Sequence, residues 1–389
     1  MGPPQGASSP HSRVALADLQ PPTLSVAVLL LVTLPGALQA QENLFPQASA
    51  IGGVEVRQYS FGSSFTVDRV RQVAVPVGVL VPIGRRFSFD IGSSWAQTSV
   101  KRPTGGSDSF SSFTDTQLRG SYVIGNDALV VSVMVNLPTG KRSTTPQQFG
   151  VASSTSSNFL LFPVSSYGTS FSVTPGLAAA TTAGDWNLGL AASARVSATY
   201  SPFKGDSASY KPGVESRFRG GVDRLIGSSR FSLGATFSTF STDQLRGGGS
   251  LGSGSFDPGN RILVDLGIVS PVGGGTLGIY LWNYHRIRSG SATSQSAAGG
   301  KENVFTAGVN GSFGLSKALS LEPAAEARFW SPASGSGRLF GAGTALRIQA
   351  LPQVAFIPSF RVDLGTIKNS AGSHSVTGWD ASAFIRYGF

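Results

Sequence analysis

The last residues of the chain, 379–389, alternate between two faces. One face is mostly polar and carries Asp380 and Arg386. The other is apolar with an aromatic residue at each end, and consists of Trp379, Ala381, Ala383, Ile385, Tyr387 and Phe389. A period of two is the signature of a β-strand. An apolar, aromatic-tipped face backed by a polar face is typical of a barrel strand with lipid outside and water inside.

The same period recurs from residue 51 onward. Apolar side chains occupy alternate positions in 73–83, 186–200, 319–329 and 354–364. Fifty glycines and only 13% charged residues are unusual for a soluble enzyme of this length. Past the amino terminus, no apolar run is long enough for a transmembrane helix. These features favour an all-β chain. A soluble β-sandwich is the alternative, because its strands also alternate.

Turn-forming residues divide the chain into hairpins. Glycine, Asn and Asp tolerate the positive φ of tight turns, and predict short turns at 84–86, 125–127, 183–185, 226–230, 273–275, 316–318 and 351–353. Longer Gly/Ser/Thr-rich loops alternate with them near 100–113, 138–168, 200–212, 242–258, 289–301, 331–337 and 365–376. This asymmetry predicts a transmembrane antiparallel up-and-down β-barrel with periplasmic short turns and about sixteen strands, or about fourteen if the segment near 52–63 is not a strand.

The amino terminus has the pattern of an export signal. Residues 23–34 are apolar, Pro35-Gly36 end the run, and Ala37-Leu-Gln-Ala40 follows. An apolar stretch too short to span, before small residues, indicates a cleaved signal peptide. We expect a signal peptide at 1–40, a periplasmic tail at 41–50 and a barrel at 51–389. The expected location is the bacterial outer membrane, reached through the periplasm.

Two motifs resemble known families. Phe389, with Tyr387 two residues earlier, resembles the carboxy-terminal insertion signal of Gram-negative outer-membrane β-barrels. This implies that the barrel-assembly machinery reads Trp379, Ile385, Tyr387 and Phe389. Val135-Asn-Leu-Pro-Thr-Gly-Lys141 resembles the LPTG stretch of outer-membrane channels linked to aromatic-compound degradation, which are distantly similar to long-chain fatty-acid transporters. That resemblance implies a channel.

The polar faces of the predicted strands place ionic side chains in the lumen. The acids are Asp90, Asp115, Glu215, Asp223, Asp265, Glu322, Glu326, Asp363 and Asp380. The arginines are Arg119, Arg195, Arg217, Arg219, Arg328, Arg347, Arg361 and Arg386. Arginine pairs bidentately with carboxylates, so this set predicts a network across the lumen. Such a network either creates a transverse field that orients solutes or braces the wall without selecting a solute.

One predicted strand, 276–288, is ambiguous. Tyr280, Trp282 and Tyr284 share a face opposite Asn283 and His285. Because the latter two suit lipid poorly, we favour a luminal aromatic ladder of Tyr280, Trp282 and Tyr284. The chain's net charge is +10, with many cations in the loops, namely Lys101, Arg102, Lys141, Arg142, Lys204, Lys211, Arg246, Arg288, Lys301 and Lys368. Outer-membrane lipid and lipopolysaccharide phosphates are candidate partners for them, and anionic solutes are the alternative.

Signals for other functions are weak. The chain has no cysteine, so disulfides and thiol chemistry are excluded, and we expect no metal or other cofactor. Gly248–Gly252 matches G-x-S-x-G and Ser201–Lys204 matches S-x-x-K, but both lie in predicted loops, as does His374 beside two serines. Enzyme catalysis and nucleic-acid binding are not expected. We expect a channel for passive passage of small solutes, aromatic or anionic, or else a non-conducting structural or surface-binding barrel.

Overall fold

The computed structural model describes residues 48–389, apart from 63–64, 126–127, 248–252, 288–289 and 292–300. The predicted signal peptide therefore lies outside the described residues. The strands that build the wall are β1 (Ser49–Phe61), β2 (Arg69–Ile83), β3 (Phe87–Lys101), β4 (Ser107–Phe113), β5 (Thr116–Ile124), β6 (Leu129–Leu137), β7 (Ser172–Ala183), β8 (Trp186–Ser197), β10 (Glu215–Ile226), β11 (Ser229–Phe240), β14 (Arg261–Val272), β15 (Gly275–Arg286), β17 (Glu302–Ser316), β18 (Leu319–Pro332), β19 (Ser336–Leu351), β20 (Val354–Asn369) and β21 (Gly372–Gly388).

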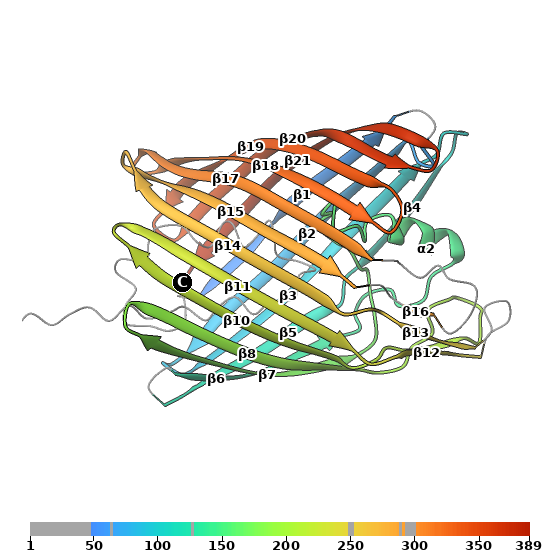
Figure 1. Cartoon of the computed structure of the whole chain (residues 1–389), viewed down its shortest axis with the longest axis horizontal. Coiled ribbons are helices and arrows are strands. Elements are labelled where there is room, and N and C mark those ends of the chain that lie inside the picture. Colours follow the sequence, from blue (N-terminus) through green and yellow to red (C-terminus); the bar gives the residue numbers. More distant parts are fainter. Residues whose placement is uncertain (1–47, 63–64, 126–127, 248–252, 288–289, 292–300) are drawn as a thin grey trace, which may run out of the picture.

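These strands form one closed antiparallel barrel (Figure 1). Because β4 and β5 pair with successive halves of β3, the described strands occupy sixteen positions in the wall. Closure comes from β1, which pairs with β21 from Ser49↔Gly388 to Phe61↔Val376. The sixteen-strand prediction is confirmed. The fourteen-strand alternative is wrong, because the segment near 52–63 is the strand that closes the barrel.

The seven predicted turns join neighbouring strands at one end of the barrel. Gly84, Gly125, Gly184 and Gly227 have φ between 60° and 69°, a conformation that glycine adopts at no steric cost. The longer connections lie at the opposite end, where Figure 1 also places α2 (Pro146–Ser153). Among the described residues, no helix is long and apolar enough to cross a membrane.

Several predicted loops are shorter than expected. β4 occupies half of the predicted loop at 100–113, and β20 and β21 extend the hairpin through 365–376 to Asn369 and Gly372. A small second sheet of β9 (Ser209–Lys211), β12 (Asp243–Arg246), β13 (Gly254–Asp257) and β16 (Gly290–Ser291) lies within loops predicted as irregular. These strands lack an apolar stripe because they rise beyond the apolar band, so periodicity does not reveal them.

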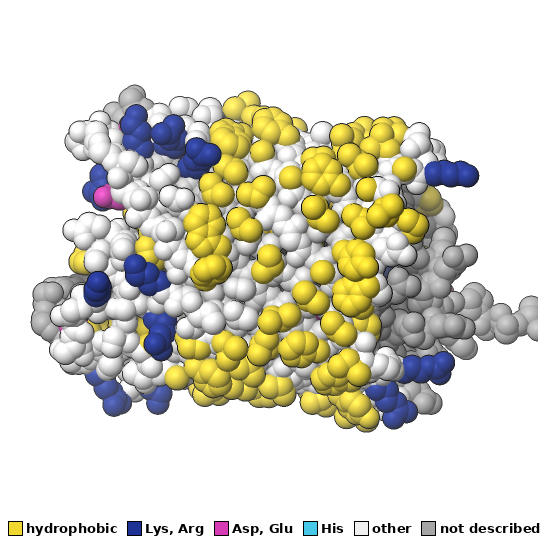
Figure 2. All heavy atoms as spheres, turned by 180° about the vertical axis from the view of Figure 1, so that it is seen from behind, with side chains coloured by type: hydrophobic (Ala, Val, Ile, Leu, Met, Phe, Trp, Pro, Cys, Tyr) yellow, Lys and Arg dark blue, Asp and Glu magenta, His cyan; other side chains and the backbone are white. Residues whose placement is uncertain are grey.

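The wall separates an apolar outer face from a polar inner face. Val77, Leu190, Phe218 and Phe360 are each more than half exposed on the outside. Figure 2 shows hydrophobic side chains across the middle of the visible face of the barrel, with Lys and Arg at both ends. A band of this kind is the surface that a transmembrane barrel turns toward lipid.

The face assignment makes a direct prediction. Leu190 is 70% exposed on the outer face, and Leu190→Arg should destabilise the barrel by about 2–4 kcal/mol. Ser232 faces inward, directly opposite Asp223, so Ser232→Arg should cost less than about 1 kcal/mol. Urea-dependent refolding into lipid vesicles measures both free energies of unfolding. Equal costs at the two sites would contradict the assignment.

Candidate functional site: an asymmetric lumen

The β6–β7 connection folds back into the barrel. Its residues 155–170, here called the inserted segment, bury Phe159, Leu160, Phe162, Val164 and Tyr167. They pack in one cluster with inward-facing side chains of the wall, including Tyr59, Val70, Ala74, Ala96, Val100, Leu339, Ile367 and Val376. These wall residues come from β1, β2, β3, β19, β20 and β21. The inserted segment therefore fills the lumen beside those six strands.

Polar side chains of the wall hold the backbone of the inserted segment. Gln72 accepts a hydrogen bond from the Val164 amide and donates one to its carbonyl, both at 2.8 Å. Arg57 donates to the carbonyl of Leu161, and Arg328 donates to that of Phe159 at 2.5 Å. A buried irregular segment needs such partners for its peptide groups, because an unpaired buried peptide is costly. Gln72, Arg57 and Arg328 therefore fix its position.

Both ends of the inserted connection are fastened at Asp115, between β4 and β5. Its carboxylate accepts from Asn136 Nδ2 (2.9 Å), Gly140 N (3.1 Å), Thr169 N (2.7 Å) and Thr169 Oγ1 (2.9 Å). Gly140 leaves no room for a Cβ, because the carbonyl of Tyr167 occupies that space. The Leu137–Gly140 motif thus forms the neck where the chain turns inward, and Asp115 stabilises it.

Below the inserted segment lies a buried charged network. Glu326 accepts from Arg328 (2.6 Å), Arg361 (2.8 Å) and Tyr280 (2.7 Å). Asp363 accepts from Arg361 at 2.9 Å and from Tyr59 at 2.8 Å. The side chains of Arg328, Glu326 and Asp363 are only 3–5% exposed. Buried charges persist only when paired and hydrogen-bonded, and this network meets that requirement.

The network extends to β1, which the sequence reasoning missed. Arg57 pairs with Asp380 at 3.0 Å and with Glu55 at 3.1 Å. Glu55, Arg57 and Tyr59 alternate along one face of the strand, and that polar period was the available signal. Their inward position follows from the place of β1 between β2 and β21.

The opposite wall carries ion pairs that water reaches. Its pairs are Arg119–Asp90 (2.7 Å), Arg217–Glu215 (2.6 Å) and Arg219–Asp265 (2.9 Å). The Arg219 and Asp265 side chains are 31% and 38% exposed, against 3% and 5% for Arg328 and Glu326. The Arg217 and Arg219 pairs lie on β10 and β14, which do not contact the inserted segment, and Asp90 lies on β3 nearer the turn end than the residues Ala96 and Val100 that contact it. The lumen is therefore packed on one side and solvated on the other.

Three inward arginines have no carboxylate partner among the described residues. Arg195 donates to the Ser172 hydroxyl at 3.2 Å, and Arg261 lies over the Phe240 ring at 4.6 Å from its centroid. Arg386 lies near a second cation, Arg347, which pairs with Glu322 at 2.9 Å. Arg195 and Arg261 are at the loop end of the barrel and Arg386 at the turn end. Each end of the lumen therefore contains at least one arginine without a carboxylate partner among the described residues.

The aromatic residues of β15 lie between the packed and solvated regions. Tyr280 reaches Glu326 across β17, so it points inward, and Trp282 and Tyr284 share its face. Trp282 lies directly opposite Asp265 of the solvated wall. Tyr284 is buried. The structure thus places all three residues of the predicted ladder on the inner face.

The other sequence candidates occupy varied positions. Asp223 lies at the turn end, with Arg230 at 3.3 Å and Asn187 at 3.2 Å. His374 is wrongly predicted as a loop residue: it is buried in β21, beside Phe65 and Asn369. It belongs to a strand because the β20–β21 hairpin extends past the apolar band. Ser201–Lys204 lies in a loop, and Gly248–Gly252 lies outside the described residues.

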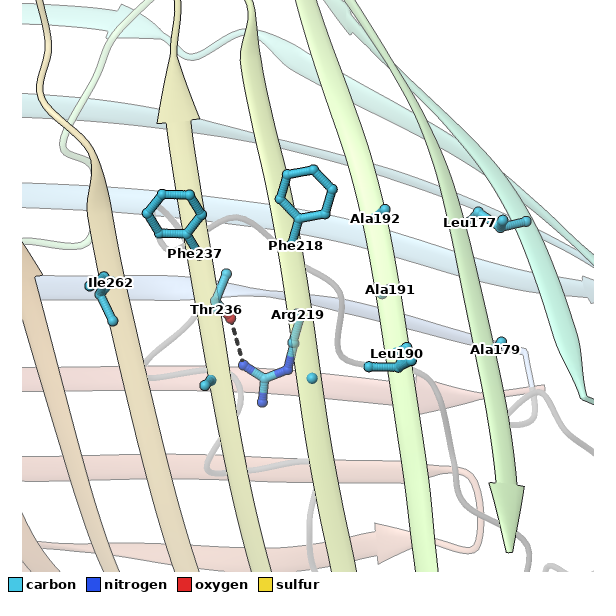
Figure 3. A pocket seen from close by; sticks show the side chains of 12 residues that line it. Leu177, Ala179, Leu190, Ala191, Ala192, Phe218, Arg219, Thr236, Phe237 and Ile262 are labelled. Atoms are coloured by element: carbon cyan, nitrogen blue, oxygen red, sulfur yellow. Dashed lines mark hydrogen bonds between the residues drawn. The ribbon is translucent and has the colours of Figure 1, made fainter.

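A separate hollow lies on the outer face, not in the lumen. It has a volume of about 580 Å³ and is bounded by Leu177, Leu190, Phe218, Phe237 and Ile262 over small residues of the neighbouring strands. Figure 3 shows these side chains spread across the wall, with Arg219 bonded to Thr236 between them. Because its rim is the exposed apolar stripe, this hollow faces lipid and is not part of a solute path.

Comparison with known proteins gives likeness in fold. No protein-family model and no curated sequence matches the chain. The TodX monoaromatic hydrocarbon channel, as a deletion mutant, aligns with 10% identity and a TM-score of 0.47 over 90% of this chain and 92% of that chain. A FadL homologue of Pseudomonas aeruginosa aligns with 10% identity and a TM-score of 0.47 over 89% of this chain and 91% of that chain. The CymD monoaromatic hydrocarbon channel aligns with 8% identity and a TM-score of 0.42 over 88% of this chain and 89% of that chain.

These three solved proteins resemble the chain in overall barrel fold. What those channels carry is a property of those proteins.

The role of Asp115 can be tested by removing its carboxylate. Asp115→Ala leaves the donors of Asn136, Gly140 and Thr169 without their acceptor, which should cost at least about 2 kcal/mol. Asp108→Ala is the control, because the Arg102–Asp108 pair is exposed and should contribute under about 1 kcal/mol. Urea unfolding from lipid vesicles compares them. If both variants lose the same small amount, Asp115 does not anchor the connection.

Proposed function

We propose that the chain is an outer-membrane channel for the passive passage of small water-soluble solutes, with a preference for anions. One observation carries this proposal: luminal ion pairs are dehydrated beside the inserted segment and water-accessible on the facing wall. A continuous solvated wall is what a diffusing solute requires. An apolar outer band supports a membrane location, and long loops opposite short turns support the outer membrane.

The unpaired arginines support the anion preference. Arg195 and Arg261 lie near the loop end and Arg386 near the turn end, where each raises the local potential for an entering anion. Elsewhere on the solvated wall, Arg119, Arg217 and Arg219 are paired with acids. Paired arginines let an anion pass without being trapped. Trp282 borders this path and offers contact to the apolar part of a solute.

A non-conducting barrel is the second candidate, and the inserted segment favours it. The inserted segment and the buried charged network together exclude water from the side of the lumen lined by β1 and β18–β21. In that function, the ion pairs of the facing wall would brace the barrel and select no solute.

We also propose that the barrel-assembly machinery reads the last strand. Tyr387 and Phe389 are 46% and 57% exposed, and their rings stack at 5.7 Å. Both side chains continue the outward stripe of Trp379 and Ile385. These exposed aromatics are available to a partner during insertion.

Planar-bilayer recording tests the channel. The wild type should give unitary currents with a reversal potential that favours anions under a salt gradient. Replacing Arg195, Arg261 and Arg386 with Gln in one triple variant should shift the reversal potential toward cation selectivity. The shift should shrink as salt rises from 0.1 M to 1 M, because the Debye length falls from about 10 Å to about 3 Å.

Arg338→Gln provides the control, because Arg338 is the neighbour of inward Leu339 and so faces outward. It should leave the reversal potential unchanged. Absence of unitary currents from the folded wild type would support the non-conducting barrel. Currents whose ion selectivity is unchanged by the triple substitution would contradict the proposed path.

A further inference from the structure

A compact cationic cluster lies on the outer face at the loop end of β2 and β3. Arg69 is directly opposite Lys101 in the register of the two strands. Arg71 follows Arg69 on the same face, two residues along the strand. All three side chains are exposed. We call these three residues the rim cluster.

Strand alternation fixes the direction of the rim cluster. Val70 and Gln72 are buried inside the barrel, and Gln72 holds the inserted segment, so Arg69 and Arg71 point outward. Val100 is likewise buried in the inner cluster, which turns Lys101 outward. The rim cluster therefore faces away from the lumen and takes no part in the solute path.

The rim cluster sits directly above the apolar band. Along β2, Arg69 and Arg71 continue the outward stripe of Val73, Val75, Val77, Val79 and Val81. On β3, Trp95 is opposite Val75, and tryptophan marks the level of a membrane interface. The cations therefore lie at headgroup height in the leaflet on the loop side.

No carboxylate of the described residues forms an ion pair with the rim cluster. Like charges directly opposite each other destabilise a pair of strands, and Arg69 faces Lys101. The outward neighbours on β1, β3 and β4 are uncharged, namely Gln58, Ser60, Gln97, Ser99, Ser107 and Ser109. Of the nearby acids, Asp108 pairs with Arg102, and Asp68 forms no ion pair with the rim cluster among the described residues. The rim cluster is therefore available to an anion from outside the protein.

We propose that the rim cluster binds the phosphate groups of a phosphorylated glycolipid of the outer leaflet. Two guanidinium groups can each hold a phosphate through paired N–H donors. The surrounding Ser and Gln side chains add hydrogen-bond donors for sugar and phosphate oxygens. The valine stripe below accepts the acyl chains. A site that joins cations, hydroxyls and an apolar wall at interface height fits a lipid headgroup. This inference does not depend on whether the barrel conducts.

The test compares variants in lipid vesicles. The full-length protein, refolded into phosphatidylcholine vesicles with a small fraction of bisphosphorylated lipid A, is extracted in detergent, and retained lipid A is quantified by native mass spectrometry. Neutralising Arg69, Arg71 and Lys101 with Gln should lower retention at least about tenfold. The matched control neutralises Arg102, Lys141 and Lys211, which lie in the loops, and should retain lipid A as the wild type does. Heat-modifiable migration confirms that each variant is folded.

A third arm uses lipid A stripped of its phosphates, which should be retained poorly by the wild type. Equal retention by wild type and rim-cluster variant would overturn the proposal. Equal loss in both triple variants would overturn it as well, because the binding would then reflect total loop charge. Strong retention of dephosphorylated lipid A would show that acyl contact alone accounts for the binding.

Discussion

Closure of the backbone hydrogen-bond ladder is the constraint on which the rest of this structure depends. Hydrocarbon offers no partner for a peptide group, so a sheet crosses a membrane only without edges. Here β1 and β21 remove the last edges, and Phe389 N donates to Ala48 O at 2.9 Å beyond them. Closure also fixes register, and a shift of one residue would turn every outward side chain inward. The apolar band and the luminal charges are two consequences of the same pairing.

Within that wall, the inserted segment and the buried charges depend on each other. A sixteen-strand barrel is wide enough to hold water, and the segment removes water from one side only. The guanidinium groups of Arg57 and Arg328 each form an ion pair with a carboxylate and donate a hydrogen bond to a backbone carbonyl of the inserted segment. The carboxylates offset the cost of burying these cations, and the cations satisfy a backbone that has no regular structure. The solvated half of the lumen is what this arrangement leaves open.

Much of the barrel could be predicted from the sequence, because strand alternation and tight turns are local properties. The stripes at 73–83 and 354–364 and the turns at Gly84 and Gly227 lie where expected. The inserted segment could not be predicted, since Phe159 and Phe162 are buried by side chains distant in sequence. Glu55 and Arg57 had a period-two signal, but their roles depend on partners on β21 and on the segment. β4 had no apolar stripe, because it extends beyond the lipid band.

The inserted segment packs one side of the lumen and leaves the other side open to water. The chain has no cysteine, so single cysteines report accessibility directly. In folded protein in vesicles, a small charged thiol reagent should modify Thr236→Cys on the solvated wall. It should leave Ala74→Cys and Thr98→Cys, beneath the inserted segment, unmodified until the protein is unfolded. Equal labelling rates at all three positions would contradict the account, as would protection of Thr236→Cys.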